Sequence, residues 1–356
     1  MNLLEPYSLV GHFLEHPPAG FVASLSLQGV PVFEANFDLL TTAEEPLRRR
    51  VRALPCYARW SSLLQPRTCF VGTTVSEYAL FPEGLSASDL VADLKSAYAG
   101  KYPFLIIKDI PQESPLLDDI SNAYAEDVVA ACRVAGFVVL EGQALAYVPI
   151  DFDSVDTYLS RLSHGRRKNI RRKLRARAEL DVEVLPTGAA CFEDPELLTQ
   201  FYQLYLNVYG QSELHFDLLS AEFFRAVLQG RGDGGVVFVY RHAGVLIGYN
   251  ICYVHQGRLI DKYIGLVYPQ ARTFNLYFVS WFQNLEYALS NGLSHYIAGW
   301  TDPQVKADLG ASFTFTRHAV HIRNRLLRAV LHRVAGHFES DRAWRDALHG
   351  KTTSHS

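Results

Sequence analysis

The segment from Val236 to His321 constrains the fold of this chain more than any other part of the sequence. Three runs in it are rich in β-branched and aromatic residues and are separated by only a few residues: Val236 to Tyr240, Leu246 to Val254 and Leu259 to Leu266. Because such short connections join neighbouring antiparallel strands, the pattern predicts an antiparallel meander.

A long helix is expected directly after the meander, from Asn275 to Ser290. It is apolar on nearly every side, so it has to be buried, and Asn291-Gly292 is typical of a left-handed helix end. The spacing then predicts a strand, a short helix and a second strand: His295 to Ala298, Pro303 to Leu309 and Phe313 to His321. The segment is therefore expected to form an α/β (α+β) unit.

The rest of the chain shows the same mixture of elements. Further strands are expected at Phe21 to Leu27, Val32 to Leu40, Thr68 to Leu80, Phe104 to Lys108, Phe137 to Leu140, Leu145 to Ile150 and Val182 to Leu185. Further helices are expected at Ser86 to Tyr98, Ile120 to Val134, Glu196 to Val208 and Ala221 to Leu228.

The length of 356 residues is about twice that of a typical domain of ~150 residues. The segment Pro149 to Asp156, with one proline and three aspartates, resembles a domain boundary. We therefore expect one domain over residues 1–150, a second over residues 151–337, and a C-terminal helix and tail over residues 338–356.

The formal charge of −3 hides a strong asymmetry. The segment from Arg161 to Arg177 contains nine lysines and arginines and no acid. The rest of the chain has 25 basic and 37 acidic residues, so its formal charge is −12. Helical spacing predicts a cationic stripe of His164, Lys168, Arg171 and Arg175, and an apolar docking stripe of Ile170, Leu174 and Ala178. The cationic face is either a solvated surface, a site for phosphates or an anionic polymer, or a membrane-adhesive surface.

A second basic stretch runs from Arg317 to Arg333, again without acids. Apolar residues recur in it at helical spacing: Ile322, Leu326, Leu327, Val330 and Leu331. The pattern predicts a C-terminal amphipathic helix packed on its domain.

Composition excludes several classes of protein. Apolar residues make up 49% and charged residues 20%, which favours packed cores over disorder. We expect neither a membrane span nor a secretion signal, because long uncharged apolar runs and a basic N-terminal stretch are both missing. Five scattered cysteines without a C-x-x-C pair favour a reducing cytoplasm. No metal site is expected, since His318 and His321 point to opposite faces of a predicted strand.

The order of elements from Val236 to His321 resembles the cofactor half of GNAT-type acyltransferases. The run from Lys306 to Phe313 is similar to the Lys-x-x-x-Gly pattern of Fem-type peptidoglycan aminoacyltransferases. The basic segment that follows Tyr158 is similar to the helix with which such proteins open their second GNAT domain. This resemblance implies two tandem GNAT-like domains, each a mixed, mainly antiparallel sheet flanked by helices.

The donor-binding loop departs from the GNAT pattern. GNAT enzymes usually bind the CoA pyrophosphate on a Gln/Arg-x-x-Gly-x-Gly/Ala loop, whose glycines let backbone N–H groups approach the phosphates. Side chains fill both glycine positions in the corresponding stretch, which supplies Gln270, Arg272, Thr273 and Asn275 as candidate donor-binding residues. Acyl-CoA is still the expected co-substrate, and aminoacyl-tRNA gains weight as the alternative donor.

Acyl transfer to an amine needs a deprotonated nucleophile and hydrogen-bond donors for the developing oxyanion. Strand alternation predicts that Asp261, Tyr263 and Gly265 share one face. Asp261 is the candidate base or amine anchor, and Tyr263 is a candidate donor. By resemblance to the Fem pattern, Lys306 is expected to stabilise the oxyanion. The alternatives are a satisfied acid on a sheet face and an ordinary surface lysine.

The sequence thus predicts an N-acyltransferase that moves an acyl group from acyl-CoA, or an aminoacyl group from charged tRNA, to a small-molecule or peptide amine. Lys168, Arg171 and Arg175 are the candidate contacts to an anionic donor such as tRNA. The alternative is a non-catalytic protein that binds an anionic polymer or a membrane surface through its basic helices. Cys252 is expected in the core and not as a nucleophile.

Overall fold

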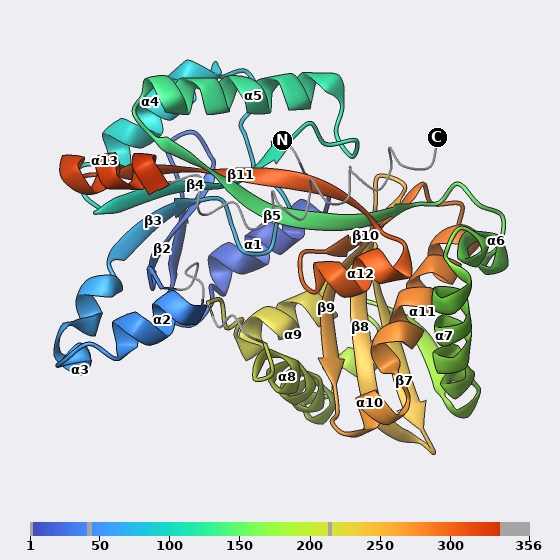
Figure 1. Cartoon of the computed structure of the whole chain (residues 1–356). Helices are drawn as coiled ribbons and strands as arrows, with labels where there is room; N and C mark the ends of the chain where they lie inside the picture. The colour runs from blue at the N-terminus through green and yellow to red at the C-terminus, as the bar shows by residue number, and fades with distance from the viewer. Residues whose placement is uncertain (1–2, 41–44, 213–215, 335–356) are drawn as a thin grey trace. The chain divides into compact units, whose positions relative to one another are not determined.

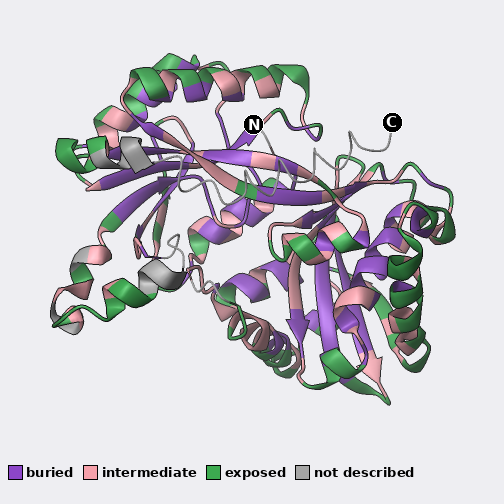
Figure 2. Cartoon of the chain, viewed as in Figure 1, coloured by how far each residue is buried: buried purple, intermediate pink, exposed green. Residues whose placement is uncertain are grey.

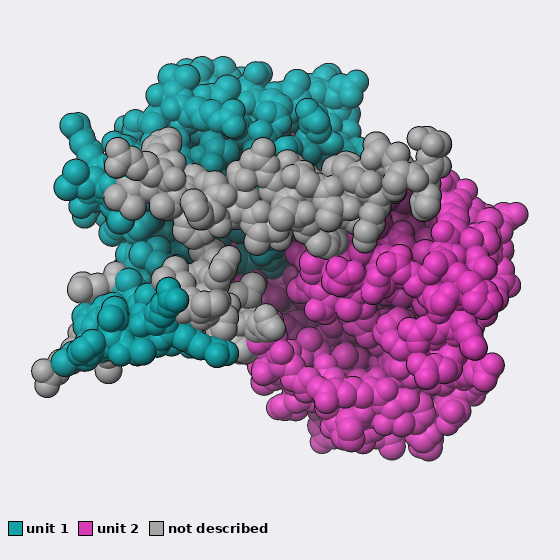
Figure 3. All heavy atoms as spheres, viewed as in Figure 1, with its two compact units in different colours: residues 1–3, 20–144, 314–356 teal, residues 4–19, 145–313 magenta. Residues whose placement is uncertain are grey.

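The computed structural model describes residues 3–40, 45–212 and 216–334. The chain divides into two compact units, which Figure 3 shows in different colours. Unit 1 consists of residues 1–3, 20–144 and 314–356, and unit 2 consists of residues 4–19 and 145–313. Two strands, β5 (Val138–Pro149) and β11 (Ser312–Ile322), contribute residues to both units.

Unit 2 contains the predicted meander. Its strands are the second part of β5, β6 (Asp181–Pro186), β7 (Gly235–His242), β8 (Val245–His255), β9 (Arg258–Leu266) and β10 (His295–Gly299). Their order is β5-β10-β9-β8-β7-β6, and every pair is antiparallel except β9 with β10. Its α-helices, seen in Figure 1, are α1 (Tyr7–Glu15), α6 (Val155–Ser160), α7 (His164–Leu174), α8 (Pro195–Tyr209), α9 (Ala221–Gln229), α10 (Gln270–Thr273), α11 (Leu276–Ser290) and α12 (Pro303–Leu309). Short 3-10 turns span Arg175–Glu179 and Ala190–Glu193.

Helix α11 covers one face of this sheet and α8 covers the other. Tyr249 on β8 stacks on Phe201 of α8, with ring centroids 4.3 Å apart. The next residue, Asn250, instead accepts a hydrogen bond from Asn284 of α11. This division follows from the alternation of side chains along a strand. Because nine of the 15 residues of α11 are buried, the prediction of a buried helix is confirmed.

Unit 1 is built in the same way. Its strands are β1 (Val22–Leu25), β2 (Pro31–Asn36), β3 (Arg67–Val71), β4 (Phe104–Gln112), the residues of β11 from Thr314 and the first part of β5. The order is β1-β2-β3-β4-β11, and only β3 with β4 is parallel. Its helices are α2 (Glu45–Arg52), α3 (Tyr57–Trp60), α4 (Ala87–Tyr98), α5 (Asp119–Val134) and α13 (Arg325–Val334), with a 3-10 turn at Ser61–Leu64.

The two units repeat one order of elements: three antiparallel strands, a helix, a strand parallel to the third, a helix and a last strand. In unit 1 the order is β1, β2, β3, α4, β4, α5, β5, and in unit 2 it is β7, β8, β9, α11, β10, α12, β11. The last strands are exchanged, since β11 pairs with β4 and the end of β5 pairs with β10. The predicted fold class, mixed and mainly antiparallel sheets flanked by helices, is confirmed.

The compact units differ from the continuous ranges 1–150 and 151–337 that the sequence suggested. The break at residues 144 and 145 lies close to the predicted boundary, but residues 4–19 belong to unit 2 and residues from 314 belong to unit 1. The exchange of last strands explains the second difference, because strand pairing holds the residues of β11 against β4.

Several predicted strand boundaries are wrong, and the structure explains two of the differences. The predicted strands Phe137 to Leu140 and Leu145 to Ile150 form the single strand β5. Gly142 lies inside it, where an added Cβ would lie 2.3 Å from the Thr316 hydroxyl, so this glycine marks a close approach and not a break. The strand predicted over Thr68 to Leu80 ends at Val71, because Gly72 takes a φ of 125° and a turn follows.

Each unit has its own hydrophobic core, seen as purple segments in Figure 2. In unit 2 the core lies under α11 and includes Trp281 and Phe282. In unit 1 it lies between the strands and helices α4 and α5, and it includes Leu105 and Val128. Both cores consist mainly of aliphatic and aromatic side chains, as the composition predicted.

Helix α13 differs from its prediction. Ile322 lies in β11 and is buried, but Leu326 is 81% exposed and Leu327 is 45% exposed, so neither leucine is buried against unit 1. The side chains of Val330 and Leu331 lie outside the described residues, as does the predicted tail over residues 338–356.

Candidate functional site

The strands β9 and β10 part at one end of their pairing. The parallel register joins three residue pairs and ends with Ile260 opposite Ile297. Just beyond that pair, the register of β10 on β5 shifts between Ile297 and Gly299, and Gly299 takes a φ of 79°. We call the place where Asp261 and Ala298 diverge the β9–β10 fork.

The ammonium group of Lys306 lies at the β9–β10 fork. Lys306 belongs to α12, is only 4% exposed, and its Nζ donates a hydrogen bond of 2.5 Å to the carbonyl oxygen of Ala298. A Cβ added at Gly299 would lie 3.9 Å from Lys306 Nζ and 3.9 Å from the carbonyl oxygen of Asp261. The structure therefore brings Lys306 and the backbone of Asp261 together. The alternative of an ordinary surface lysine is wrong, because this side chain is buried.

The end of α12 shows why a glycine follows Lys306 after three residues. Gly310 ends the helix with a φ of 100°, a conformation that costs little only for glycine. A Cβ at Gly310 would also lie 2.8 Å from the hydroxyl of Tyr158, which donates to the carbonyl oxygen of Leu309. Tyr158 and Gly310 thus fix the position of the helix that carries Lys306.

Asp261 is held by a buried polar network. Its Oδ1 accepts from Asn250 Nδ2 at 2.6 Å, and its Oδ2 accepts from Asn284 Nδ2 at 3.1 Å and from the Tyr296 hydroxyl at 2.9 Å. Asn250, Asn284 and Tyr296 are each at most 1% exposed. Burial and the nearby Asp261 charge raise the pKa of Tyr296 well above 10, so it stays a donor at neutral pH. The arrangement suits a fixed carboxylate that accepts hydrogen bonds.

The prediction that Asp261 and Tyr263 share a face is wrong. In the pairing of β9 with β8, Tyr263 lies opposite Ile251 and Asp261 lies opposite Cys252, so Lys262 is an extra residue and β9 has a bulge. Asp261 therefore faces α11, whereas the Tyr263 ring makes edge contacts with Phe223 and Phe224 of α9. Gly265 lies on the Tyr263 side, since an added Cβ would meet Leu204 of α8 at 2.9 Å.

The candidate donor-binding loop forms α10 and the start of α11. Arg272 Nη2 donates to Gln211 Oε1 at 2.9 Å, and the hydroxyl of Thr273 donates to the carbonyl oxygen of Pro269 at 3.5 Å. Asn275 precedes α11 in a left-handed conformation with a φ of 51° and makes no side-chain cap. Gln270, Arg272 and Thr273 are exposed. The four residues lie together, and the backbone N–H groups that begin α11 follow them directly.

The cationic segment from Arg161 to Arg177 forms α7 and a following 3-10 turn. Ile170 is buried and Leu174 packs against the core of unit 2, as predicted. Ala178 is exposed instead of docked, because the α-helix ends at Leu174 and the tighter turn changes the period of the side chains. Ala176 packs against the core in its place.

The predicted stripe residues Lys168, Arg171 and Arg175 are exposed, but they are not equivalent. Arg171 pairs with Asp156 at 2.8 Å. Within the described residues, no acid lies within ion-pair distance of Lys168 or Arg175. Three other arginines of the segment also pair with acids: Arg161 with Asp151, Arg166 with Asp308 and Arg177 with Glu286. The free cationic surface is therefore smaller than the sequence count suggests.

Cys252 is fully buried, and burial raises the pKa of its thiol well above the ordinary value of 9.0. Its Sγ lies 3.3 Å from Asn250 Oδ1, inside the network that holds Asp261. A buried thiol that resists ionisation is a poor nucleophile, which agrees with its prediction as a core residue. Among the described residues, no group of three or more His, Cys, Asp or Glu side chains is arranged to hold a metal ion.

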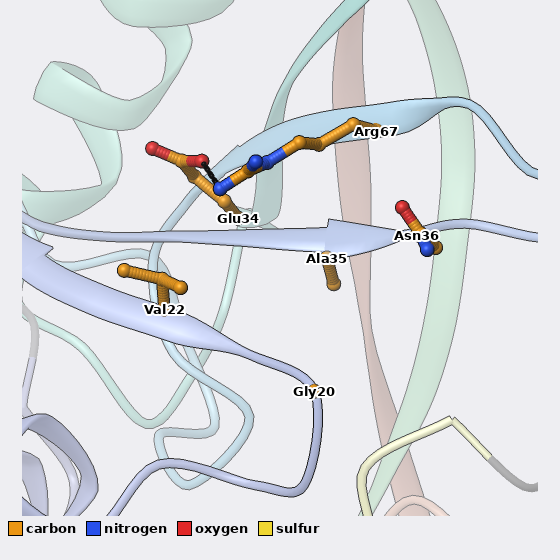
Figure 4. Close-up of a pocket in the computed structure, with 6 residues that line it drawn as sticks. All are labelled: Gly20, Val22, Glu34, Ala35, Asn36 and Arg67. Carbon is orange, nitrogen blue, oxygen red and sulfur yellow. Dashed lines mark ion pairs between the residues drawn. The ribbon is translucent and has the colours of Figure 1, made fainter.

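Unit 1 contains two polar features that the sequence reasoning missed. A bulge in β4 sets Lys108 and Asp109 opposite His318; Asp109 donates its backbone N–H to His318 Nδ1 at 3.1 Å, and the Lys108 ammonium donates to the Asp109 carboxylate. The second feature is a pocket of about 230 Å³ at the ends of β2 and β3, shown in Figure 4. Arg67 and Glu34 form an ion pair of 2.6 Å at its wall.

A family model described as FemAB-like, for peptidoglycan biosynthesis and recognition, matches residues 120–350. The chain belongs to the FemAB-like family. The match includes the β9–β10 fork, Lys306, the polar network and α7. A comparison with curated protein sequences found no match.

Two solved structures with TM-scores above 0.5 share the fold of this FemAB-like protein. L-PGS from Bacillus licheniformis is 12% identical with a TM-score of 0.53, over 94% of this chain and 99% of that chain. The C-terminal domain of a protein named as a lysylphosphatidylglycerol synthetase, from Agrobacterium fabrum, is 13% identical with a TM-score of 0.52, over 87% and 86%. FemX is 13% identical with a TM-score of 0.49, over 91% and 98%. The family match confirms the predicted Fem-like group, and the repeated order of elements in the two units agrees with the predicted double arrangement.

None of the helices in the described part of this FemAB-like chain has the length and apolar character needed to cross a bilayer.

The residues that sequence reasoning missed in unit 2 are Asn250, Asn284 and Tyr296. A signal for two of them was present, since asparagines in an otherwise apolar strand and helix have to find buried partners. Their meeting at Asp261 required the bulge in β9, which the sequence does not reveal.

Proposed function

We propose that this protein transfers an aminoacyl group from charged tRNA to an amine acceptor at the β9–β10 fork of unit 2. In this reaction the amine nitrogen attacks the carbonyl carbon of the tRNA ester, a C–N bond forms and the C–O bond to the ribose breaks. The amine gives up a proton, and the released ribose hydroxyl takes one up. Membership of the FemAB-like family supports a transferase of this kind.

One observation carries the proposal. A buried lysine ammonium, that of Lys306, lies at a point where two parallel strands separate, beside a glycine, Gly299, whose added Cβ would meet no atom closer than 3.9 Å. An ammonium group fixed in a low-dielectric site stabilises negative charge that develops on a carbonyl oxygen far better than one in water. In the proposed step, Lys306 shifts its hydrogen bond from the Ala298 carbonyl to the tetrahedral oxyanion.

Asp261 is the proposed amine anchor. Its carboxylate already accepts three hydrogen bonds from the core, which fix its orientation, and it is only partly buried. A carboxylate held in this way attracts a cationic amine and orients it before the proton leaves. Tyr263 has no role in this proposal, because its ring packs against α9 on the opposite face of the sheet.

The preference for tRNA over acyl-CoA rests on two features. The loop that would bind a CoA pyrophosphate carries side chains in both glycine positions, and Arg272 and Thr273 already bond within the protein. Helix α7 also presents Lys168 and Arg175 as exposed cations, which suits a polyanionic donor. In the proposal, Gln270 and Asn275 contact the ribose and phosphate near the ester.

The test is a transfer assay with purified full-length protein. Charged tRNA with a labelled amino acid is mixed with amine acceptors, including peptidoglycan-type peptides. Phosphatidylglycerol is tested separately, because one structural neighbour carries its name and its acceptor group is a hydroxyl; label transfer to this lipid and to no amine would contradict the proposed amine acceptor. A parallel assay measures release of free CoA from an acyl-CoA panel with the same acceptors. Label transfer that depends on Lys306 supports the proposal. CoA release without label transfer would show that acyl-CoA, and not charged tRNA, is the donor. Failure of both assays would refute the proposal that this protein is an acyltransferase.

A further inference from the structure

We propose that the exposed face of α13 in unit 1 binds the surface of an anionic phospholipid bilayer. The face is formed by exposed apolar and cationic residues, and we call it the α13 patch: Leu326, Leu327, Val134, Arg323, Arg325 and Arg133. The proposal is independent of the transfer reaction, which was assigned to unit 2.

The apolar part of the α13 patch has no cover within the described residues. Leu326 is 81% exposed and Leu327 is 45% exposed, and Val134 at the end of α5 is 91% exposed. Figure 2 shows the first turn of α13 mainly in the colour of exposed residues. Single exposed apolar residues need no explanation, but neighbouring leucines on the outer face of a helix mark an interaction surface.

The α13 patch is also a cluster of positive charge. No acid occurs between Asp308 and Glu339, while five arginines do. Arg323 donates to the carbonyl oxygen of Gly100 at 3.2 Å, so the start of α13 lies against the end of α4. An added Cβ at Gly136 would lie 3.8 Å from Arg328, which brings the end of α5, with Arg133 and Val134, next to α13. Helix ends and arginines therefore converge on one surface.

The combination of leucines and arginines favours a bilayer over a nucleic acid. Phosphates of a nucleic acid would pair with the arginines but would leave the leucines in water. A basic amphipathic helix at an anionic bilayer satisfies both groups, because its apolar side chains enter the acyl boundary while its cations lie among the headgroups.

The two basic helices, α7 and α13, differ in where their apolar side chains lie and in whether their arginines pair with acids. In α7 the apolar residues Ile170 and Leu174 face the core, and arginines such as Arg171 pair with acids. In α13 the leucines face outward, and no described acid pairs with Arg323 or Arg325. Helix α7 is therefore suited to a polyanion in solution, and α13 is suited to a charged lipid surface.

The test is sedimentation of the full-length protein with vesicles of phosphatidylcholine, with or without phosphatidylglycerol. We expect binding only to vesicles that contain phosphatidylglycerol, and weaker binding at high salt. The double variant Leu326→Ser with Leu327→Ser should bind about tenfold more weakly, as expected for loss of buried leucine area. In the double variant Arg323→Gln with Arg325→Gln, the affinity for these vesicles should fall about fivefold for each arginine removed.

Ile120→Ser is the matched control. Ile120 is 82% exposed at the start of α5, between Asp119 and Ser121, so its loss should leave vesicle binding unchanged. Thermal melting of each variant checks that the fold is intact. Vesicle binding that is absent, insensitive to the leucine variant or equally weakened by Ile120→Ser overturns the proposal. So does tRNA binding that the arginine variant weakens without any change in vesicle binding.

Discussion

Lys306 Nζ donates a hydrogen bond to the carbonyl oxygen of Ala298, one residue beyond the last pair of the parallel β9–β10 register. Burying an ammonium group costs free energy because the group loses its hydration, unless hydrogen-bond acceptors replace the water. A buried lysine at this point therefore calls for a functional explanation. Charge stabilisation at the β9–β10 fork is the function that we propose for it.

Replacing Lys306 by methionine should remove the charge and keep most of the volume. We expect kcat for transfer to fall about 10²- to 10³-fold with a small change in KM, as for loss of an oxyanion donor. Lys101→Met, which removes an exposed lysine of unit 1, should leave kcat and KM unchanged. Full activity of Lys306→Met would show that the lysine only holds the end of β10.

Asp261→Asn should destabilise unit 2 whether or not Asp261 takes part in the reaction. An amide offers one acceptor oxygen and turns an NH₂ group toward donors that now lack partners, so we expect a loss of about 2 kcal/mol in the free energy of unfolding. Urea denaturation measures it. Asp308→Asn, which breaks only the exposed pair with Arg166, should cost at most about 0.5 kcal/mol.

Charged tRNA should bind with a strong salt dependence that Lys168 and Arg175 carry. Replacing both by glutamine should reduce the slope of log K against log salt by roughly one unit for each phosphate that is no longer neutralised. Filter binding at several salt concentrations gives this slope. Arg161→Gln is the control, because Arg161 pairs with Asp151. Equal effects of both variants would argue for a diffuse charge effect and against a site on α7.

His318 should make the protein less stable in acid. Burial lowers the pKa of His318 below 6.5, so the unfolded chain takes up a proton more readily than the folded one. The stabilising contribution is therefore complete above pH 6.5 and falls as pH decreases. His318→Asn keeps an acceptor for the Asp109 N–H and should flatten the dependence between pH 7 and pH 5, measured by urea denaturation. An unchanged profile would contradict this assignment.

The five cysteines should fall into two classes toward a thiol reagent. Cys56 and Cys191 are exposed and should react in the native protein. Cys69, Cys132 and Cys252 are buried, and burial raises the pKa of Cys69 and of Cys132 to about 12. We expect two fast thiols, and five after denaturation, counted by absorbance. A third fast thiol would reopen the case for Cys252 as a nucleophile.

Local patterns were enough to predict the elements of unit 2. The meander, the buried helix α11 and the glycine that ends α12 all depend on short-range spacing, and short-range spacing is what a sequence displays. The resemblance of Lys306 and Gly310 to the Fem pattern singled out the lysine of α12 and the glycine that ends this helix. The exposed leucines of α13 show the limit of such predictions. An amphipathic pattern predicts a helix with an apolar face, but it does not indicate whether another part of the chain covers that face.

The strand register could not be predicted from the sequence, and it determines which side chains meet in the candidate site. One extra residue at Lys262 turns Asp261 toward Asn284 and Tyr296 and leaves Tyr263 on the other face. A bulge depends on long-range pairing, which the alternation within β9 does not reveal. The sequence by itself therefore determined which elements form and which residue types they carry. Only the tertiary structure decided which of those residues meet, because contacts between strands and helices distant in the chain set the register.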